Sequence, residues 1–318
     1  MLKKTETMYD SVMGIMSYTV PRPRKVGGIP TTRLFQAMLL GIGSAWDTVC
    51  PMLQDIRARD IGKSEFKSGA DFCTRADLAS EDRIKNAFSQ FKDYEIRIFG
   101  EEANCYLGDM QSKIGVRIDP IDGTRAMKFT RFKWGILVGV YHGTPEKEAQ
   151  IMSACFFPEL IHRPLMIYVQ GEGTFVMKMD KTGYRLPMKV AQSSRQNDLG
   201  NIVVTFWKHT DFSQRGRVNQ IEDEIAKANG HPLSTDSGAV DVLEACLTGG
   251  QRAMIIDGDY SLVDFIPHPA ITTLGYKIYK WDGTPMKPED PALVNAKLAI
   301  VPPGKAGKQI LEIVKQFA

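Results

Sequence analysis

Apolar positions near the start of the chain recur at intervals of three and four residues, which is the period of an amphipathic helix. The pattern predicts a long helix over residues 31–58, whose apolar positions are Leu34, Met38, Ile42, Ala45 and Val49. After a polar turn, a second helix is predicted over residues 76–91, because Leu78, Ile84 and Phe88 lie on one side of it. We expect the long helix to pack against a sheet.

Strand patterns follow these helices. Residues 95–99 alternate between polar and apolar side chains and end at the sequence Gly-Glu-Glu of residues 100–102. The apolar run of residues 114–118 leads directly into Asp-Pro-Ile-Asp-Gly-Thr at residues 119–124. Further strands are predicted over residues 134–141, 151–157, 165–169 and 173–178, the last two as a hairpin.

The second half of the chain alternates strands with helices. Strands are predicted over residues 201–205 and 253–256, and helices over residues 217–229, 240–247 and 265–274. Because strands and helices mix in both halves, the predicted class is mixed α and β, α+β or α/β, with layered sheets. Residues 1–30 end in a segment rich in proline and glycine and are predicted to form an N-terminal arm.

Composition places the chain among ordinary soluble globular proteins, since 43% of its 318 residues are hydrophobic and 24% are charged. The net charge of +3 is small, and no stretch approaches the roughly 20 apolar residues of a membrane helix. Residues 1–14 have no apolar segment after their lysines. The five cysteines are scattered without a Cys-x-x-Cys spacing, which favours reduced thiols. We expect a cytoplasmic protein that binds neither membranes nor nucleic acids.

One local excess of positive charge suggests a smaller partner. Arg125, Lys128, Arg131 and Lys133 directly follow the Asp-Pro-Ile-Asp-Gly-Thr sequence. Such a group suits a small phosphorylated molecule better than a nucleic acid, because no basic and aromatic residues alternate over a longer stretch. For Lys128 and Lys133, the alternative is a solvent-facing turn of a helix.

The Asp-Pro-Ile-Asp-Gly-Thr sequence places two carboxylates at the tip of a predicted strand. Asp119 and Asp122 are three residues apart across a turn and can bind a cation from one side; Mg²⁺ prefers a few carboxylates together with phosphate oxygens. The N–H groups of Gly123 and Thr124 can face a phosphate if they begin a helix. The alternative is a surface turn, since Asp, Pro and Gly are common turn residues.

Companion motifs decide between these interpretations. The sequence contains Gly-Glu-Glu at residues 100–102, Asp-x-x-Thr-x-Ala-Asp at residues 71–77, and the later Asp257 and Asp264. With Asp-Pro-Ile-Asp-Gly-Thr, these motifs make the chain resemble the inositol monophosphatase family of metal-dependent, lithium-sensitive phosphatases, from about residue 31 to the C-terminus.

The resemblance implies the family's layered αβαβα sandwich. An N-terminal α+β half over residues 31–180 is then expected to carry the metal site. A C-terminal α/β half over residues 181–318 is expected to lie on the substrate side. Members of this family are commonly homodimers, so the resemblance also implies a homodimer.

The resemblance further implies roles for individual residues. Two or three Mg²⁺ ions would be bound by Glu101, Asp119, the Ile121 carbonyl, Asp122 and Asp264. Thr124 and Asp71, with Glu101, would position and deprotonate the attacking water, since a Thr hydroxyl needs an acceptor to act at neutral pH. The N–H groups of Gly123 and Thr124 would bind the phosphate beside Arg125, and Asp257 would contact a substrate hydroxyl.

Other polar residues near the motifs have two interpretations each. Glu102 is either a partner of the site or a solvated carboxylate. Asp77 is expected to cap or salt-bridge its helix rather than bind metal. Asp282, followed by glycine, is more simply a hairpin turn than a second metal motif. His268, between two prolines, is more often structural than catalytic.

Two segments depart from the family's pattern. Asp264 is followed by Phe-Ile-Pro-His-Pro rather than by small residues, and Thr124 is followed by Arg-Ala-Met rather than Thr-Asn-Phe. Inositol phosphate is therefore not the expected substrate. We expect a Mg²⁺-dependent phosphomonoesterase acting on a small phosphorylated metabolite, such as a sugar, polyol, amino-alcohol or nucleotide phosphate. The alternative is a noncatalytic relative that binds a phosphorylated ligand or a partner protein.

Overall fold

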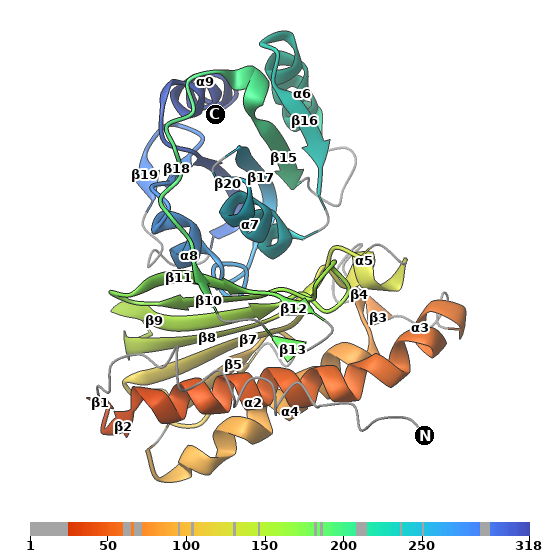
Figure 1. Cartoon of the computed structure of the whole chain (residues 1–318), viewed down its shortest axis with the longest axis vertical. Coiled ribbons are helices and arrows are strands. Elements are labelled where there is room, and N and C mark those ends of the chain that lie inside the picture. The colour runs from red at the N-terminus through yellow and green to blue at the C-terminus, as the bar shows by residue number, and fades with distance from the viewer. Residues whose placement is uncertain are drawn as a thin grey trace. The chain divides into compact units, whose positions relative to one another are not determined.

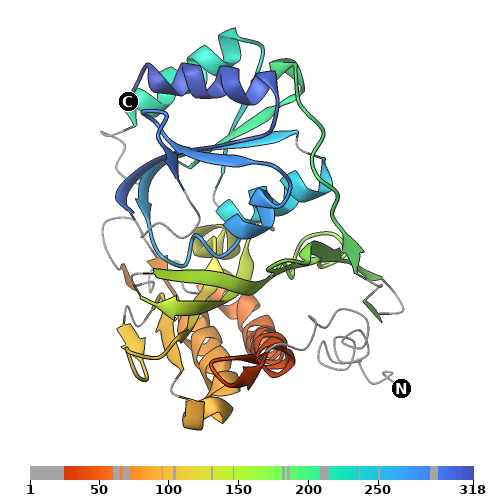
Figure 2. The same ribbon diagram turned by 90° about the vertical axis from the view of Figure 1, so that its left-hand side faces the viewer.

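The computed structural model describes most of the chain, as two compact units. Its described residues are 25–59, 65–66, 72–94, 96–102, 105–129, 132–145, 147–180, 183–184, 187–207, 215–235, 237–249, 251–286 and 293–318. The first unit takes the described residues up to Glu65 together with Phe72–Lys189. The second takes Phe66 and the described residues from Val190 to Ala318. Figure 1 and Figure 2 show the chain in two views.

The first unit begins with a short hairpin and a long helix. Strands β1 (Lys25–Val26) and β2 (Ile29–Pro30) pair before helix α2 (Thr31–Val49). The last residues of the predicted arm therefore form a hairpin, while residues 1–24 lie outside the described part of the chain. The continuous helix predicted up to residue 58 is wrong in one respect, because α2 ends at Val49, before Pro51. A proline cannot donate to the helical ladder and disrupts the preceding turn.

Two further helices complete this layer. The chain continues as the 3₁₀ turn η1 (Cys50–Met52) and helix α3 (Leu53–Arg59). The second predicted helix is confirmed as α4 (Arg75–Phe88), followed by the 3₁₀ segment η2 (Ser89–Tyr94). Helices α2 and α4 lie side by side in Figure 2 and pack closely at Gly41, where a Cβ would lie 3.2 Å from the Ile84 backbone.

A sheet of eight strands among the described residues forms the other layer of the first unit, in the order β14-β11-β10-β9-β8-β7-β5-β6. Its strands are β5 (Arg97–Gly100), β6 (Cys105–Leu107), β7 (Ile114–Asp122), β8 (Gly135–Thr144), β9 (Lys147–Phe156), β10 (Leu165–Val169), β11 (Gly173–Met177) and β14 (Met188–Lys189). The only parallel pair among these described strands is β5 with β7. The predicted strands and the β10–β11 hairpin are confirmed.

The core of the first unit lies between helices α2 and α4 and one face of this sheet. Side chains such as Met38 and Ile84 from the helices belong to one buried cluster with Val116 and Ile118 of β7. Further short elements are the pairs β3 (Glu65–Phe66) with β4 (Phe72–Cys73) and β12 (Met179–Asp180) with β13 (Gly183–Tyr184), and helix α5 (Thr124–Lys128). Strand β7 thus emerges from the core at the Asp-Pro-Ile-Asp-Gly-Thr sequence.

The second unit is built on a mixed sheet with helices on both faces. The order of its six described strands is β16-β15-β17-β20-β18-β19, and β15 runs parallel to both β16 and β17. These strands are β15 (Val203–Trp207), β16 (His231–Ser234), β17 (Arg252–Tyr260), β18 (Lys277–Lys280), β19 (Pro285–Met286) and β20 (Leu293–Val301). The helices are η3 (Leu199–Asn201), α6 (Gly216–Lys227), α7 (Gly238–Leu247), α8 (His268–Thr272) and α9 (Lys305–Lys315).

Side-chain alternation explains this arrangement. Phe206 and Ile255 point to the face where α6 and α9 bury residues such as Ile221 and Ile310. Helix α7 packs against strand β17 and helix α8, and Figure 1 shows both helices on the side of the sheet opposite α6 and α9. This unit therefore has the α/β layering that the alternation of strands and helices predicts.

Two local predictions in the second unit have different outcomes. The helix predicted over residues 265–274 is shorter, because α8 covers only His268–Thr272 and residues 262–267 form turns. Pro267 and Pro269 restrict the chain to this late start. The hairpin turn predicted at Asp282 is confirmed between β18 and β19, where its Oδ1 accepts a hydrogen bond of 2.7 Å from the Thr284 N–H.

Within the described residues, no helix combines the length and apolarity needed to cross a membrane.

Candidate functional site

The end of strand β7 holds two buried carboxylates close together. Pairing with β8 is regular as far as Asp119 opposite Leu137 and resumes at Asp122 opposite Gly135, with an irregularity between them. Such irregularities re-aim side chains at a strand end. Asp119 is 2% exposed and Asp122 is 5% exposed, and a carboxylate oxygen of one lies within 4.8 Å of a carboxylate oxygen of the other. The predicted pair is thus brought together.

This pair fits a hard divalent cation. Two carboxylates so close and so buried repel each other when both are ionised. A cation between them removes this repulsion, and oxygen donors of this kind suit Mg²⁺ or Ca²⁺. The donors Asp119 and Asp122, with the nearby backbone carbonyl of Ile121, are all oxygens. The structure therefore offers the chemistry that the predicted metal requires.

Glu101 lies at the same edge of the sheet. Strands β5 and β7 are parallel and pair Gly100 with Ile118, so their carboxyl ends meet. The Glu101 N–H donates a hydrogen bond of 3.1 Å to the Ile118 carbonyl. Glu101 and the next residue, Glu102, are both half-buried. The Gly-Glu-Glu motif therefore follows strand β5 beside the end of β7.

The hydroxyl of Thr124 is bonded to a carboxylate of helix α4. Its Oγ1 donates to Oδ1 of Asp77 at 2.8 Å and lies 2.9 Å from the Ile121 carbonyl. Gly123, with φ of +84°, makes the turn from β7 into α5 in a backbone conformation that favours glycine. The predicted partner, Asp71, lies outside the described residues, so its role stays a prediction.

Asp77 serves two purposes. It caps its helix as predicted, because its Oδ2 accepts a 2.8 Å hydrogen bond from the Thr74 N–H in a capping box. It is also fully buried. Burial, followed by the nearby Glu102 carboxylate, raises the pKa of Asp77 to about 7, although hydrogen bonds from Thr74 and Thr124 oppose the shift.

The sequence interpretation missed Asp77 as the partner of Thr124. The Thr-x-x-Asp spacing of residues 74–77 predicts the helix cap, but no local signal shows that the same aspartate reaches Thr124, 47 positions along the chain. The half-buried Glu102 carboxylate contributes to the raised pKa of Asp77.

Helix α5, which follows Thr124, is held by charged side chains. Arg57 of α3 donates from Nε to the Met127 carbonyl at 2.9 Å and pairs with Glu159. Trp134 donates from its indole to Glu159 at 2.6 Å. Burial alone would raise the pKa of Glu159, but the hydrogen bonds from Arg57 and Trp134 hold it below its ordinary value.

The basic residues after the motif differ in exposure. Arg125 is exposed, Lys133 is half-buried and Lys128 is only 4% exposed. The solvent-facing interpretation is therefore wrong for Lys128. Arg131 lies outside the described part of the chain. Arg125 is thus available to a ligand from solvent.

The second unit carries the later candidate residues. Asp257 lies on β17 opposite Lys297 of β20, and Asp264 lies in the turns before α8; both are half-buried. The Asp264 carboxylate accepts a hydrogen bond from the Ser261 N–H. His268 is 1% exposed and packs edge-on against Phe265, and burial lowers its pKa to about 3. This burial fits the structural interpretation of His268.

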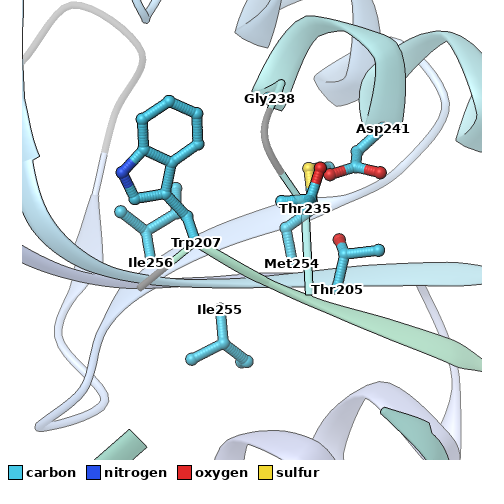
Figure 3. Close-up of a pocket in the computed structure, with 8 residues that line it drawn as sticks. All are labelled: Thr205, Trp207, Thr235, Gly238, Asp241, Met254, Ile255 and Ile256. Atoms are coloured by element: carbon cyan, nitrogen blue, oxygen red, sulfur yellow. The ribbon is translucent and has the colours of Figure 1, made fainter. Parts of the chain in front are cut away.

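A small hollow, open to solvent, lies beside the carboxyl end of β15, against residues 254–256 of the parallel strand β17. It is lined by Thr205, Trp207, Thr235, Gly238, Asp241, Met254, Ile255 and Ile256. Trp207 and Asp241 rise on the same side of the sheet in Figure 3, whereas Ile255 points to the other side. Asp241 pairs with Arg252, whose Nη1 lies 3.3 Å from the Asp241 Oδ1. Ligands of α/β sheets commonly bind at this end of parallel strands.

Comparison with solved structures shows the fold. The chain is 14% identical to the extragenic suppressor protein SuhB from Bartonella henselae, with a TM-score of 0.71 over 89% of this chain and 98% of that chain. It is 17% identical to an inositol monophosphatase from Anabaena (Nostoc), with a TM-score of 0.63 over 89% of this chain and 96% of that one. A structure of an IMPase/NADP phosphatase complexed with NADP and Ca²⁺ matches at 14% identity, with a TM-score of 0.63 over 88% and 93% of the two chains.

These similarities confirm the predicted layered fold of mixed helices and sheets. No curated protein sequence matches the chain. The model of the inositol monophosphatase family, however, matches residues 38–316. That match spans most of the chain and confirms the predicted resemblance. The chain belongs to the inositol monophosphatase family.

Proposed function

We propose that the chain is a Mg²⁺-dependent phosphomonoesterase that hydrolyses a small phosphorylated metabolite. The observation that carries the proposal is the hydrogen bond of 2.8 Å from Thr124 to the buried Asp77, next to the strand end that bears Asp119 and Asp122. A module that only bound a phosphorylated ligand would not need a hydroxyl paired with a buried base. Membership of a family of phosphatases supports the same conclusion.

The metal ligands in this proposal are Glu101, Asp119, the Ile121 carbonyl, Asp122 and Asp264. Bound Mg²⁺ would supply neutralisation of the phosphate charge, which otherwise repels a nucleophile. The carboxylates of the chain would supply the oxygen ligands that bind the ion. A similar structure is described as complexed with NADP and Ca²⁺, which supports a divalent cation beside a phosphorylated ligand.

Thr124 and Asp77 orient the attacking water. The Thr124 hydroxyl has one proton, and both of its described neighbours, the Asp77 carboxylate and the Ile121 carbonyl, accept. A lone pair of Oγ1 is then left to accept a hydrogen bond from a water molecule. As that water attacks phosphorus, its proton passes to Oγ1 and the hydroxyl proton passes to Asp77. The ester P–O bond breaks at the same phosphorus, and the alcohol leaves after its oxygen takes up a proton from solvent. A pKa near 7 suits Asp77 to this role at neutral pH.

The remaining contacts select the substrate. We propose that the N–H groups of Gly123 and Thr124 bind the phosphate and that the exposed Arg125 approaches it from solvent. We propose that the second unit binds the alcohol part through Asp257, which is half-buried on β17 opposite Lys297 of β20. Lithium sensitivity, a homodimeric state and a cytoplasmic location, expected from the resemblance and the composition, stay predictions.

The test is phosphate release from a panel of sugar, polyol, amino-alcohol and nucleotide phosphates, with Mg²⁺ and with a chelator. Turnover is expected only with Mg²⁺. Asp122→Asn should lower it about 100-fold or more without unfolding the chain, because it removes a charged ligand but no core volume. Asp109→Asn, at an exposed turn, is the matched control and should leave turnover unchanged.

Two results would contradict the proposal. Folded wild-type protein that binds metal but turns over no member of the panel would favour the noncatalytic alternative. Unchanged turnover in Asp122→Asn would show that the metal ligands are misassigned.

A further inference from the structure

One buried carboxylate near the site has no role in the proposed reaction. Glu81 lies on helix α4, one turn beyond Asp77, and is only 2% exposed. Residues four apart share a face of a helix, so both carboxylates point from α4 toward the ends of β5 and β7. A buried carboxylate is costly unless hydrogen bonds and an opposite charge compensate it. Its contacts therefore indicate what it is for.

Two contacts compensate Glu81. Its Oε1 forms an ion pair with Lys85, one turn further along α4. Its Oε2 accepts a hydrogen bond of 2.8 Å from the N–H of Glu102. The first contact neutralises the charge within the helix, and the second reaches across to the sheet. Glu81 is thus a link between α4 and the Gly-Glu-Glu motif.

The glycine of that motif is shaped around the same carboxylate. A Cβ placed on Gly100 would overlap the carboxylate group of Glu81. Any larger residue at this position must therefore displace Glu81 or the strand end. Glu81 can therefore occupy its buried position only because Gly100 has no side chain.

We propose that Glu81 is a positioning residue that fixes the direction of the Glu101 side chain. The N–H of Glu101 is held by the Ile118 carbonyl of strand β7, and the N–H of the next residue, Glu102, is held by Glu81. Because both flanking peptide groups are tied, the Cα–Cβ bond of Glu101 has a defined direction at the sheet edge, which limits where its carboxylate can lie. This inference rests on the proposed role of Glu101 as a metal ligand.

The test measures metal binding directly, so that it does not depend on turnover. Mn²⁺ binding to the full chain would be followed by electron paramagnetic resonance, well below the melting temperature of each variant. Glu81→Ala and Glu81→Asp should weaken Mn²⁺ binding by about 10- to 100-fold, as loss of a partner behind a metal ligand usually does. Glu81→Gln keeps an oxygen that can accept from the Glu102 N–H, and should bind within about threefold of wild type.

Two further variants separate positioning from general stability. Gly100→Ala should weaken Mn²⁺ binding like Glu81→Ala, and the double variant should bind no more weakly than either single one, because both disturb the same contact. Glu244→Ala removes a carboxylate that pairs with Arg252 on a helix of the second unit, and should leave Mn²⁺ affinity unchanged.

The outcomes distinguish the two proposals. Glu81→Ala should raise the Mg²⁺ concentration needed for a half-maximal rate of phosphate release. Glu81→Gln should bring this concentration back toward the wild-type value. Folded Glu81→Ala or Glu81→Asp with wild-type Mn²⁺ affinity would overturn the positioning role. Metal binding that responds to Glu81 in a protein without turnover would instead contradict only the proposed hydrolysis.

Discussion

His268 is a buried imidazole that makes the stability of the chain depend on pH. Burial lowers its pKa from an ordinary 6.5 to about 3. Between these values the unfolded chain binds a proton that the folded chain does not bind. The free energy of unfolding therefore falls as the pH drops below 6.5, by about 1.4 kcal/mol per pH unit for this one group.

Replacing the imidazole should remove this dependence. Between pH 6.5 and pH 5, the free energy of unfolding should fall by about 2 kcal/mol less in His268→Gln than in wild type. Urea unfolding in the presence of a chelator measures this difference. His231→Gln, at an exposed position, is the control and should keep the wild-type slope. Parallel pH profiles for wild type and His268→Gln would contradict the prediction.

Helix α5 depends on a side chain from another helix. Arg57 of α3 bonds the Met127 carbonyl and pairs with Glu159, and these two side chains are only 19% and 16% exposed. Arg57→Met removes both interactions and leaves a carboxylate without its cation. We expect a loss of about 2 kcal/mol in the free energy of unfolding, since hydrogen bonds to charged groups are worth roughly 1.5–3 kcal/mol. Urea unfolding measures it.

A double-mutant cycle shows whether the pair carries this loss. Adding Glu159→Gln to Arg57→Met should cost much less than Glu159→Gln alone, because the partner is already gone. Arg83→Met, which removes an exposed bond to Thr48, is the control and should change stability by less than about 0.5 kcal/mol. Additive effects at Arg57 and Glu159 would show that the two side chains act separately.

The elements themselves were largely predictable from the sequence, because periodic apolar positions specify which face is buried. Helix α4, strand β7 and the β10–β11 hairpin follow directly from such patterns. The differences arise where a local rule overrides the period. Pro51 follows the end of α2, and Pro267 delays α8 to His268.

The sequence predicts the two adjacent carboxylates of the proposed metal site, but it does not predict Asp77 as the proposed base. Asp119 and Asp122 belong to one short motif, so their proximity follows from sequence spacing. The pairing of Thr124 with Asp77 joins residues 47 positions apart. It depends on how α4 packs against the end of β7, which no local pattern reveals. The bond from the Glu102 N–H to Glu81 likewise depends on how α4 packs against the sheet.

At the scale of the whole molecule, the proposed metal ligands come from distant parts of the sequence in both units. A metal that binds only the folded chain stabilises it by mass action, by about 2.7 kcal/mol when the free metal concentration is 100 times its dissociation constant. Mg²⁺ is therefore expected to raise the melting temperature of the wild-type protein, and a chelator should reverse the change. Calorimetry over a series of Mg²⁺ concentrations measures the effect.

Single ligand variants identify which unit takes part in this stabilisation. Asp122→Asn should abolish most of the Mg²⁺-dependent shift, because the ion would lose one of two adjacent buried carboxylates in the first unit. If Asp264 is a ligand as proposed, Asp264→Asn should reduce the shift as well, although it lies in the second unit. Asp282→Asn, at an exposed hairpin turn, should leave the shift unchanged. A full shift in Asp264→Asn would confine metal binding to the first unit, because loss of a charged ligand weakens binding of the ion to the folded chain.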